Sequence, residues 1–598
     1  MRFPHFLSKN TKCEAPSHFI FVDTETFNVE IESNKYEARL KMGVACYYRN
    51  YKMRGKQYIQ EEWLEFTTTD EFNNWLLSKL YDKTNLWCFA HNMKFDFQVL
   101  GVAKFMMEHD FLTDIVVIDS PPFFIQYRNA KKAVMFICSM NYFVTSLKKL
   151  GESIGEAKLK MPVNDAPKEE WQKYNRQDVV VLKTAILLFI DFVKQHNLGN
   201  FQKTLASQAF SAYRHRFMNK SIFIHSDESV LEMERNSYHG GRTECFFIGE
   251  RKDNFYLLDV NSMYPAVMFD NEFPFQLQGT TENIDIITLK QLLKVYCCVA
   301  QVEIQTNIPV YPLVQDNKII FPIGNFITYL TTPEIKFALE NNHIKQIIKV
   351  AVYRKSKIFY NYVDELYKLR LQYKQQNNSA FEYMLKIMMN SLYGKFGQSG
   401  KHWNTIDTFP DLKFEEWIEK DIDTGEIKKY RKLLGTIQIM QQESESRHSF
   451  PAIAAHVTAY SRILLWNYIT LAGCKNVFYC DTDSLLVNST GLNNLKPIIN
   501  KYKLGALKLE KEFSYINIRS PKDYVFDKIV KIKGVRKQAI KISENEFQQD
   551  QFWGISHAWS QEIYDKQIIQ VITKKLSRIY TKGIVKENGM VEPFHISI

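Results

Sequence analysis

The chain has 598 residues, of which 45% are hydrophobic and 24% charged, a composition typical of a soluble globular protein and a length that predicts several domains. No apolar stretch reaches the roughly 20 residues that cross a bilayer, and the first residues lack a signal-peptide core, so we expect a cytoplasmic protein without membrane contact. The net charge of +11 suits a phosphate-backbone partner, and nine Cys without a CxxC pair indicate reduced thiols and no zinc site.

Acidic residues of the N-terminal third form a first candidate site. Residues 19–25 predict a strand, and because side chains alternate along a strand, Asp23 and Glu25 point to one face. Asp96 follows another apolar run, while Tyr174 and Asp178 lie one turn apart on a predicted helix. Singly, each acid is more typical of a surface or capping residue. Together, four carboxylates could hold two metal ions for phosphodiester hydrolysis, with Tyr174 orienting the water.

A second set of acids lies in the C-terminal half. An apolar run ends at Asp259, and residues 477–487 have the pattern of a buried hairpin with Asp481 and Asp483 at its turn. Two anions this close repel each other unless a cation lies between them, and oxygen ligands favour Mg²⁺ or Mn²⁺. A turn whose Asp side chains only cap backbone amides is the alternative for the hairpin alone.

A helix predicted between these acids carries polar groups on one face. Lys386, Asn390 and Tyr393 share that face, and Gly394 is a natural C-cap. A cation, an amide and an aromatic ring side by side would suit a nucleoside triphosphate.

Three segments, taken in order, resemble the polymerase motifs of family B DNA polymerases. They are Asp259-Val-Asn-Ser-Met-Tyr-Pro, Lys386-x-x-x-Asn-Ser-Leu-Tyr-Gly and Tyr479-x-Asp-Thr-Asp-Ser. The chain is most similar to the small, protein-primed branch of bacteriophages and linear mobile elements. Asp23-x-Glu25, Asn92-x-x-x-Asp96 and Tyr174-x-x-x-Asp178 likewise resemble the exonuclease motifs of proofreading polymerases. The resemblance implies an α/β multidomain fold, in which an RNase H-like 3′-5′ exonuclease domain precedes a right-hand polymerase with palm, fingers, thumb and two insertions.

The resemblance divides the chain into eight segments. They are an exonuclease domain (1–200), a linker and start of the palm with a Tyr-x-Gly-Gly element (201–258), palm motif A (259–265), insertion 1, which would contact DNA and the priming protein (266–358), fingers (359–397), insertion 2, which would enclose the duplex and separate strands (398–450), the palm (451–525) and a thumb that grips duplex phosphates (526–598).

The resemblance also implies roles for individual residues. The residues that would take part in catalysis are Asp259, Asp481, Asp483, Asp23, Glu25, Asp96, Asp178 and Tyr174. Metal ions would bind Asp259, Val260, Asp483, Asp23, Glu25 and Asp178. The nucleotide would meet Val260, Tyr264, Lys374, Lys386, Asn390 and Tyr393. DNA would meet Tyr238, Gly240, Gly241, Asn92, Phe95, Ser146, Leu147, Thr458, Arg462, Lys522 and Tyr524.

Some of these assignments keep alternatives. Residues 145–150 also read as an ordinary amphipathic helix end, and the supporting lysine of the exonuclease is either Lys158 or Lys160. Tyr264 resembles the steric gate that excludes a ribose 2′-hydroxyl. The fingers are expected as two antiparallel helices, over 359–376 and from a capping box at 379–382.

The function so implied is DNA-directed DNA polymerase activity with 3′-5′ exonuclease proofreading, in genome replication of a phage, virus or mobile element. Two Mg²⁺ ions are expected in each site, with Mn²⁺ as a substitute. The partners would be primer-template DNA, deoxynucleoside triphosphates and a terminal protein as primer, and we expect a monomer in the host-cell interior. A polymerase primed by nucleic acid, a protein that is mainly a 3′-5′ exonuclease and a non-catalytic nucleic-acid-binding protein are the alternatives.

Overall fold

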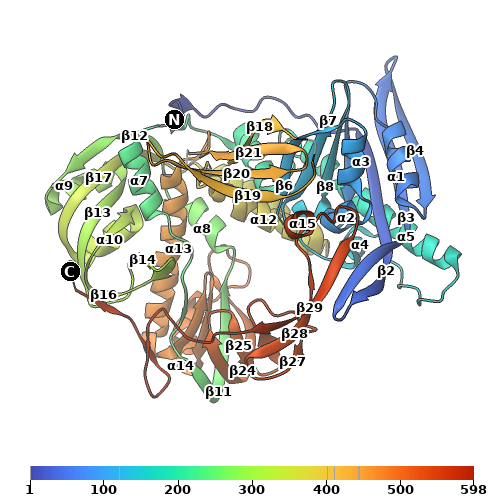
Figure 1. The fold of residues 1–598 in the computed structure, drawn as a ribbon. Helices are drawn as coiled ribbons and strands as arrows, with labels where there is room; N and C mark the ends of the chain where they lie inside the picture. The colour runs from blue at the N-terminus through green and yellow to red at the C-terminus, as the bar shows by residue number, and fades with distance from the viewer. Residues whose placement is uncertain (1, 120, 401, 410, 442–444, 598) are drawn as a thin grey trace.

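The computed structural model describes residues 2–119, 121–400, 402–409, 411–441 and 445–597. Those parts of the predicted exonuclease domain, insertion 2 and thumb that fall on the remaining residues lie outside it. Most described strands belong to four sheets with helices packed around them, as Figure 1 shows. This is the mixed α/β, multidomain organisation that we expected.

The largest sheet lies in the N-terminal third. Its order is β27-β28-β29-β3-β2-β5-β8-β7-β6, with β4 on the edge of β3. The N-terminal strands are β2 (His18–Glu32), β3 (Lys35–Met53), β4 (Lys56–Phe66), β5 (Asn85–Ala90), β6 (Leu112–Ile118), β7 (Phe123–Arg128) and β8 (Ala133–Cys138). The strand predicted at 19–25 is therefore confirmed as part of β2.

Both faces of this sheet are buried. Phe19 and Phe21 of β2 pack into a core with the long helix α5, while Ile20 and Val22 between them face the opposite core. The helices of this region are α1 (Thr69–Ser78), α2 (Met93–Val99), α3 (Val102–Glu108), α4 (Leu147–Ile154) and α5 (Lys168–Gln195). Helix α5 begins at Lys168, so Tyr174 and Asp178, predicted one turn apart on a helix, lie well inside it.

The second sheet carries the C-terminal acids. Its antiparallel order is β10-β22-β23-β11-β24-β25-β26. The strands are β10 (Thr243–Cys245), β11 (Gly249–Val260), β22 (Val477–Asp481), β23 (Ser484–Asn488), β24 (Leu507–Ser520), β25 (Asp523–Phe526) and β26 (Ile529–Lys531). The predicted hairpin is confirmed as β22 and β23. Helices α8 (Met263–Asp270) and α13 (Pro451–Ala472) pack against each other beside this sheet.

Two antiparallel helices follow, α11 (Tyr360–Gln375) and α12 (Ser379–Phe396), as predicted. Two details of that prediction are wrong. Asn378, and not Ser379, caps α12, because its side chain accepts the N–H of Phe381 at 3.1 Å. Gly394 does not end the helix, which continues for two residues and is followed by Gly397.

Two smaller sheets occupy the predicted insertions. The first has the order β12-β17-β13-β16-β32, and β13 pairs antiparallel with β16. Its elements are β12 (Phe273–Glu282), α9 (Ile286–Val295), β13 (Tyr296–Thr306), β16 (Ile323–Thr331), α10 (Thr332–Glu340), β17 (Ile344–Ser356) and β32 (His595–Ile596). The second contains β18 (His402–Thr408), β21 (Thr436–Gln441), β20 (Ile427–Leu433) and β19 (Glu415–Lys420), in that order. A turn that includes residues 423–425 joins β19 to β20.

Within the described ranges, the C-terminal segment builds only a two-stranded sheet of its own, β30 (Ile584–Val585) with β31 (Val591–Glu592). Its strands β27 (Ile540–Lys541), β28 (Glu546–Phe552) and β29 (Gln567–Lys575) extend the N-terminal sheet, because β29 pairs with the part of the β3 edge that β4 leaves uncovered. Helix α15 (Ile555–Ser560) lies between β28 and β29, and β32 pairs in parallel with β16. The predicted thumb segment thus contacts both the first domain and insertion 1.

One hydrophobic cluster joins three distant segments. Trp559 of α15 and Leu433 of β20 pack with Phe97 of α2 in the same core. The indole N–H of Trp559 donates to Oε1 of Gln98 at 3.1 Å, and the amide of Gln98 donates to the carbonyl of Ile563 at 2.7 Å. Helix α2, the four-stranded sheet and α15 are therefore in mutual contact (Figure 1).

The remaining elements are short or connect the sheets. They are β1 (His5–Phe6), α6 (Leu205–Ala212), β9 (Phe223–Ile224), α7 (Glu228–Ser237), β14 (Leu313–Gln315), β15 (Lys318–Ile320), α14 (Ser489–Leu495), β30 (Ile584–Val585) and β31 (Val591–Glu592). None of the helices in the described ranges is both long enough and apolar enough to cross a bilayer.

Candidate active sites

An acidic cluster joins β2 to α5. Asp23 and Glu25 extend from β2 and Asp178 from α5, and a carboxylate oxygen of each lies within 4.8 Å of the other two. Asp96, the fourth predicted acid, lies on α2, where its Oδ1 accepts the hydroxyl and the main-chain N–H of Thr24 at 2.7 and 3.2 Å. The structure thus brings three of the acids together at one point and places the fourth behind β2.

Burial raises the pKa of all four carboxyl groups. It raises the pKa of Glu25 to about 6, with Asp178 adding repulsion, and that of Asp96 to about 7. The pKa of Asp23 lies well above its usual range because of burial and then of the neighbouring Asp96, Asp178 and Glu25. Such a cluster is costly to ionise without a compensating cation.

Lys158 supplies one positive charge to this cluster. Its Nζ forms an ion pair with Oδ2 of Asp178 and lies 4.7 Å from the centroid of the Tyr174 ring. Burial lowers the pKa of Lys158, but the hydrogen bonds with Asp178 and Tyr174 outweigh it and the pKa is raised. Lys160 is exposed. Of the two lysines that the sequence left open, Lys158 contacts the acids.

The predicted DNA-contacting residues of this domain lie in two settings. Asn92 is exposed just before α2, and its backbone has the left-handed conformation (φ 83°). The centroid of the Phe95 ring lies 6.4 Å from that of the Phe552 ring in β28. Ser146 caps α4, its side chain accepting the N–H of Lys149, and Leu147 is buried. Residues 146 and 147 therefore also have the structural role that was the alternative for this segment.

The second site lies where strands of the seven-stranded sheet end. Asp259 lies opposite Ser484 in the pairing of β11 with β23, and Asp481 ends β22. The N–H of Val260 donates to the carbonyl of Asp483 at 2.8 Å, which holds the turn against β11. The side chain of Val260 is buried, so any contact with an ion must come from its main chain. Within the described ranges, these acids do not form a second group as tight as the first.

Two lysines face these carboxylates. Burial raises the pKa of Asp483 to about 6, with Asp259 adding repulsion and Lys386 opposing it. Burial also raises the pKa of Asp259, against the charges of Lys508 and Lys386. Nζ of Lys508 lies 3.4 Å from Oδ2 of Asp259, directly across the pairing of β11 with β24. Sequence reasoning gave Lys508 no role, because the only signal for it is this long-range strand register.

Asp481 faces the other side of the turn. Its Oδ1 accepts the hydroxyl of Thr243 at 3.1 Å and lies 3.7 Å from Nζ of Lys522. The N–H of Lys522 donates to the Tyr479 hydroxyl at 3.1 Å, and Tyr524 packs its ring near that of Tyr479. The predicted Lys522 and Tyr524 therefore lie beside the hairpin of acids.

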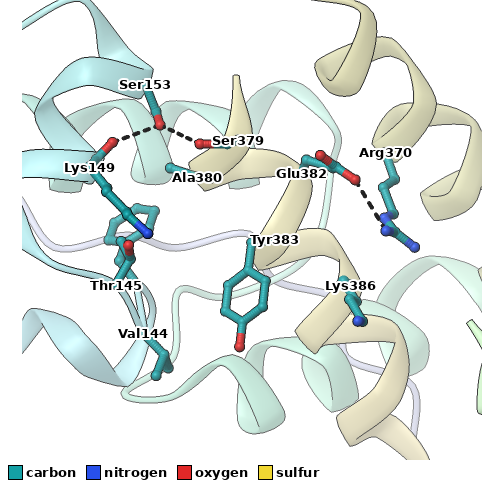
Figure 2. A pocket seen from close by; sticks show the side chains of 11 residues that line it. Val144, Thr145, Lys149, Ser153, Arg370, Ser379, Ala380, Glu382, Tyr383 and Lys386 are labelled. Atoms are coloured by element: carbon teal, nitrogen blue, oxygen red, sulfur yellow. Dashed lines mark hydrogen bonds and ion pairs between the residues drawn. The ribbon is translucent and has the colours of Figure 1, made fainter. Parts of the chain in front are cut away.

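A cavity of about 430 Å³ opens between α4, α11 and α12 (Figure 2). Lys386 lines it from α12, and Arg370 lines it from α11. Arg370 donates to the hydroxyl of Ser262 at 2.5 Å and forms an ion pair with Glu382 at 3.1 Å. Lys374, the cation predicted for α11, is instead exposed near the end of that helix. One turn separates the two residues, and of the two it is Arg370 that lines the cavity and contacts Ser262, three residues after Asp259.

Aromatic rings and an amide lie beyond Lys386. The ring centroids of Tyr264 and Tyr393 are 5.0 Å apart, and burial raises the pKa of Tyr264 to about 12, so its hydroxyl stays neutral. Oδ1 of Asn390 is buried and has no hydrogen-bond partner among the described residues. An unpaired buried amide oxygen indicates a ligand or solvent contact.

The predicted primer contacts on α13 have a different environment. Arg462 is 2% exposed, paired with the buried Glu334 of α10 at 2.7 Å, and it donates to the carbonyls of His239 and Gly240 at 2.8 and 2.9 Å. Thr458 is also buried, and its hydroxyl donates to carbonyls of the preceding turn. Both side chains are buried in this structure, and direct contact of either with the primer stays a prediction. Arg462 holds the segment that contains Tyr238, Gly240 and Gly241.

Both acidic groups fit divalent cations. The donors are carboxylate oxygens with raised pKa values, and Oδ1 of Asp178 is buried without a hydrogen-bond partner among the described residues. Asp23, Glu25 and Asp178 could hold ions at the first site. Asp259, Asp483 and the main chain of Val260 could do so at the second.

Comparisons with known proteins point to one family. Residues 87–471, more than half of the chain, match the family described as DNA polymerase type B, organellar and viral. A DNA polymerase of Kluyveromyces lactis is 28% identical over 385 residues, which cover 60% of this chain and 37% of that protein. The DNA polymerase of Streptococcus phage Cp-1 is 24% identical over 453 residues, covering 68% and 72%. The chain spans about a third to two fifths of the length of the fungal relatives it matches.

The fold has a counterpart among solved structures. Phi29 DNA polymerase complexed with primer-template DNA and incoming nucleotide superposes with a TM-score of 0.67 at 15% identity, over 94% of this chain and 100% of that one. At this identity the likeness concerns the fold, and it spans nearly all of the chain.

Proposed function

We propose that this chain, which belongs to the organellar and viral family of type B DNA polymerases, extends a DNA primer along a template and removes mispaired 3′ nucleotides. The observation that carries the proposal is the meeting of Asp259 and Asp483 at the end of one sheet, facing Lys386 from a separate helix. Two carboxylates and a lysine at one edge suit metal-assisted transfer of a phosphoryl group.

The domain assignment follows the predicted order. The seven-stranded sheet with α8 and α13 would be the palm, and α11 with α12 the fingers. The sheet of the first domain would be the RNase H-like exonuclease, and the C-terminal strands that extend it would be the thumb. The five-stranded and four-stranded sheets would be insertions 1 and 2.

In the polymerase site, the acids would bind metal ions and the basic side chains would bind the triphosphate. Bound Mg²⁺ would lower the pKa of the primer 3′-hydroxyl and stabilise charge on the reacting phosphate. Asp259 and Asp483 would hold the ions, and Asp481 would keep the turn and Lys522 in place. Lys386 and Arg370 would bind the triphosphate in the cavity of Figure 2, where Arg370 would leave Glu382 for the phosphate. Lys374 remains a prediction for a closed form of the fingers.

The base and sugar would lie against the tyrosine pair. Tyr264 would exclude a 2′-hydroxyl by its ring, and Tyr393 supports that ring from α12. The orphan carbonyl of Asn390 would accept a hydrogen bond from the nucleotide or from solvent at its edge.

In the editing site, Asp23, Glu25 and Asp178 would hold two metal ions, and Tyr174 would orient the attacking water. Lys158 would keep Asp178 and Tyr174 in place. Asn92 and Phe95 lie at the surface near β28, where a frayed 3′ end could reach them.

The contacts among α15, the four-stranded sheet and α2 support an enclosing role. They join three segments that flank the palm, and Lys413 of insertion 2 lies 3.7 Å from Glu562, next to α15. A closed arrangement of this kind would keep the duplex from dissociating between additions. The priming protein stays a proposal that rests on the family, with insertion 1 as its place of contact.

Primer extension tests the proposal. We would extend a labelled primer on a single-stranded circle with the protein, Asp259→Asn and the matched Asp253→Asn, an exposed acid on the same strand. We expect Asp259→Asn to lower extension by roughly 100- to 1,000-fold, as for other groups aimed at developing charge. Degradation of single-stranded DNA should continue in both variants. Equal extension by the two variants would overturn the assignment, and a wild-type protein that only degrades primer would support the exonuclease alternative.

A further inference from the structure

The Gly240–Gly241 segment touches both the tyrosine pair and the acidic turn. A Cβ added to Gly241 would lie 2.9 Å from the hydroxyl oxygen of Tyr264 and 2.8 Å from Cγ2 of Thr482, closer than real Cβ contacts. Thr482 is left-handed (φ 64°) between the two turn acids, and its N–H donates to the carbonyl of Arg242 at 2.7 Å. The backbone at residue 241 therefore lies in contact with the tip of the Tyr264 side chain.

A buried ion pair holds this segment in place. Arg462 donates to the carbonyls of His239 and Gly240, and its other nitrogens contact Glu334. Arg462 is 2% exposed and Glu334 is 1% exposed. If a substitution removes one of the two charges, the other stays buried without a partner and without water to solvate it. Glu334 is itself fixed, because it completes the capping box of α10 with Thr331. The pair connects α10 rigidly to the glycine segment.

Tyr264 is held by two neighbours. Its ring packs on Tyr393 of α12, a helix that also carries Lys386, and the side chains of the two tyrosines are hydrogen-bonded. The Tyr264 hydroxyl also meets Gly241. The position of the ring along the pocket thus depends on α12 and on how firmly the glycine segment is held.

From these contacts we infer that Glu334 and Arg462 are positioning residues for sugar selection: they hold Gly241 against Tyr264, and so keep its ring where it excludes ribonucleotides. The inference rests on the proposed polymerase function. It gives the buried Arg462 a role that acts through the main chain. It also makes a helix beyond the palm, α10, part of nucleotide discrimination.

The experiment compares the kcat/KM of one deoxynucleotide with that of its ribonucleotide. The variants are Glu334→Gln, Arg462→Lys and Gly241→Ala, with Glu340→Gln on the exposed part of α10 as the matched control. We expect the first two to lower the discrimination ratio by roughly tenfold, the lower end of the cost of one mis-sized group in a pocket. Glu340→Gln should keep the wild-type ratio. In a Tyr264→Val background, Glu334→Gln should change the ratio no further.

Degradation of single-stranded DNA serves as the folding control. If one of Glu334→Gln and Arg462→Lys does not fold, the other decides, and Gly241→Ala tests the last step, because it leaves the ion pair intact while its Cβ would press on Tyr264 and Thr482. A ratio that stays unchanged while extension of deoxynucleotides continues would overturn the inference. An equal fall in the Tyr264→Val background would also overturn it, since the effect would not pass through Tyr264. Absence of any extension by the wild-type protein would refute the proposed function instead.

Discussion

Replacing Lys158 by Met should disable editing and spare synthesis. Lys158 is the cation that contacts the acidic cluster, through an ion pair with Asp178, and its Nζ lies over the Tyr174 ring. Removing its charge leaves Asp178 next to Glu25 with more repulsion and takes away the hydrogen bond of Lys158 to Tyr174. The water that Tyr174 is proposed to orient would then lose its fixed position.

The size of the effect follows from the burial of the pair. The side chain of Asp178 is 2% exposed and that of Lys158 is 23% exposed, so solvent replaces the lost contact poorly. A hydrogen bond between charged groups contributes about 1.5–3 kcal/mol. If that contribution is present in the transition state, its loss slows hydrolysis about 10- to 150-fold.

Lys160→Met is the matched control, since Lys160 is the exposed lysine two residues along the same segment. We would measure single-turnover degradation of a single-stranded oligonucleotide, with primer extension as a check on folding. Lys158→Met should lose degradation alone, and Lys160→Met should behave as the wild type. Full degradation by Lys158→Met, or equal losses in the two variants, would refute the reasoning.

Two further predictions concern pH, metal ions and the enclosing contacts. Because folding raises the pKa of Glu25 to about 6 and of Asp96 to about 7, these two groups bind more protons in the folded chain than in the unfolded chain between about pH 4 and 7, and their contribution to stability falls as the pH rises. Mn²⁺ would bind the ionised carboxylates, so the melting temperature in Mn²⁺ minus that in EDTA should grow as the pH rises through this range; a difference that shrinks with pH would contradict this. Trp559→Ala removes a fully buried ring at a local cost of about 3–5 kcal/mol. On a primed circle with a DNA trap, its products should be shorter while single-nucleotide insertion is kept, and wild-type product lengths would remove the enclosing role from α15.

Features that depend on neighbouring residues were predictable from the sequence. The alternation at residues 19–25 and 477–487 gave the correct strands, and the spacing of Tyr174 and Asp178 placed them on one helix. The convergence of Asp23, Glu25 and Asp178 also follows, once a strand and a helix are known to pack together. The exact ends of helices were harder to predict. Asn378 and Ser379 are both good N-capping residues, and only the direction of the chain at the turn decides which of them caps α12.

Features that depend on distant pairing were not predictable. The choice between Lys158 and Lys160 requires the path of an irregular segment around α5. The contact of Lys508 with Asp259 requires the register of β24 against β11. The pairing of β29 with β3 joins strands from opposite ends of the chain, and no local pattern marks it.

Arg462 illustrates why a motif alone does not say which way a side chain points. An Arg on a helix beside the palm suits a phosphate contact, and nothing near it in the sequence argues for burial. Its five N–H donors also match two main-chain carbonyls and a carboxylate, and the structure supplies these from segments more than a hundred residues away. Once Glu334 is buried beside it, moving Arg462 out to DNA would leave an uncompensated charge inside the protein. The same cation that a sequence pattern assigns to DNA would therefore, by our inference, act on the nucleotide pocket from within the protein.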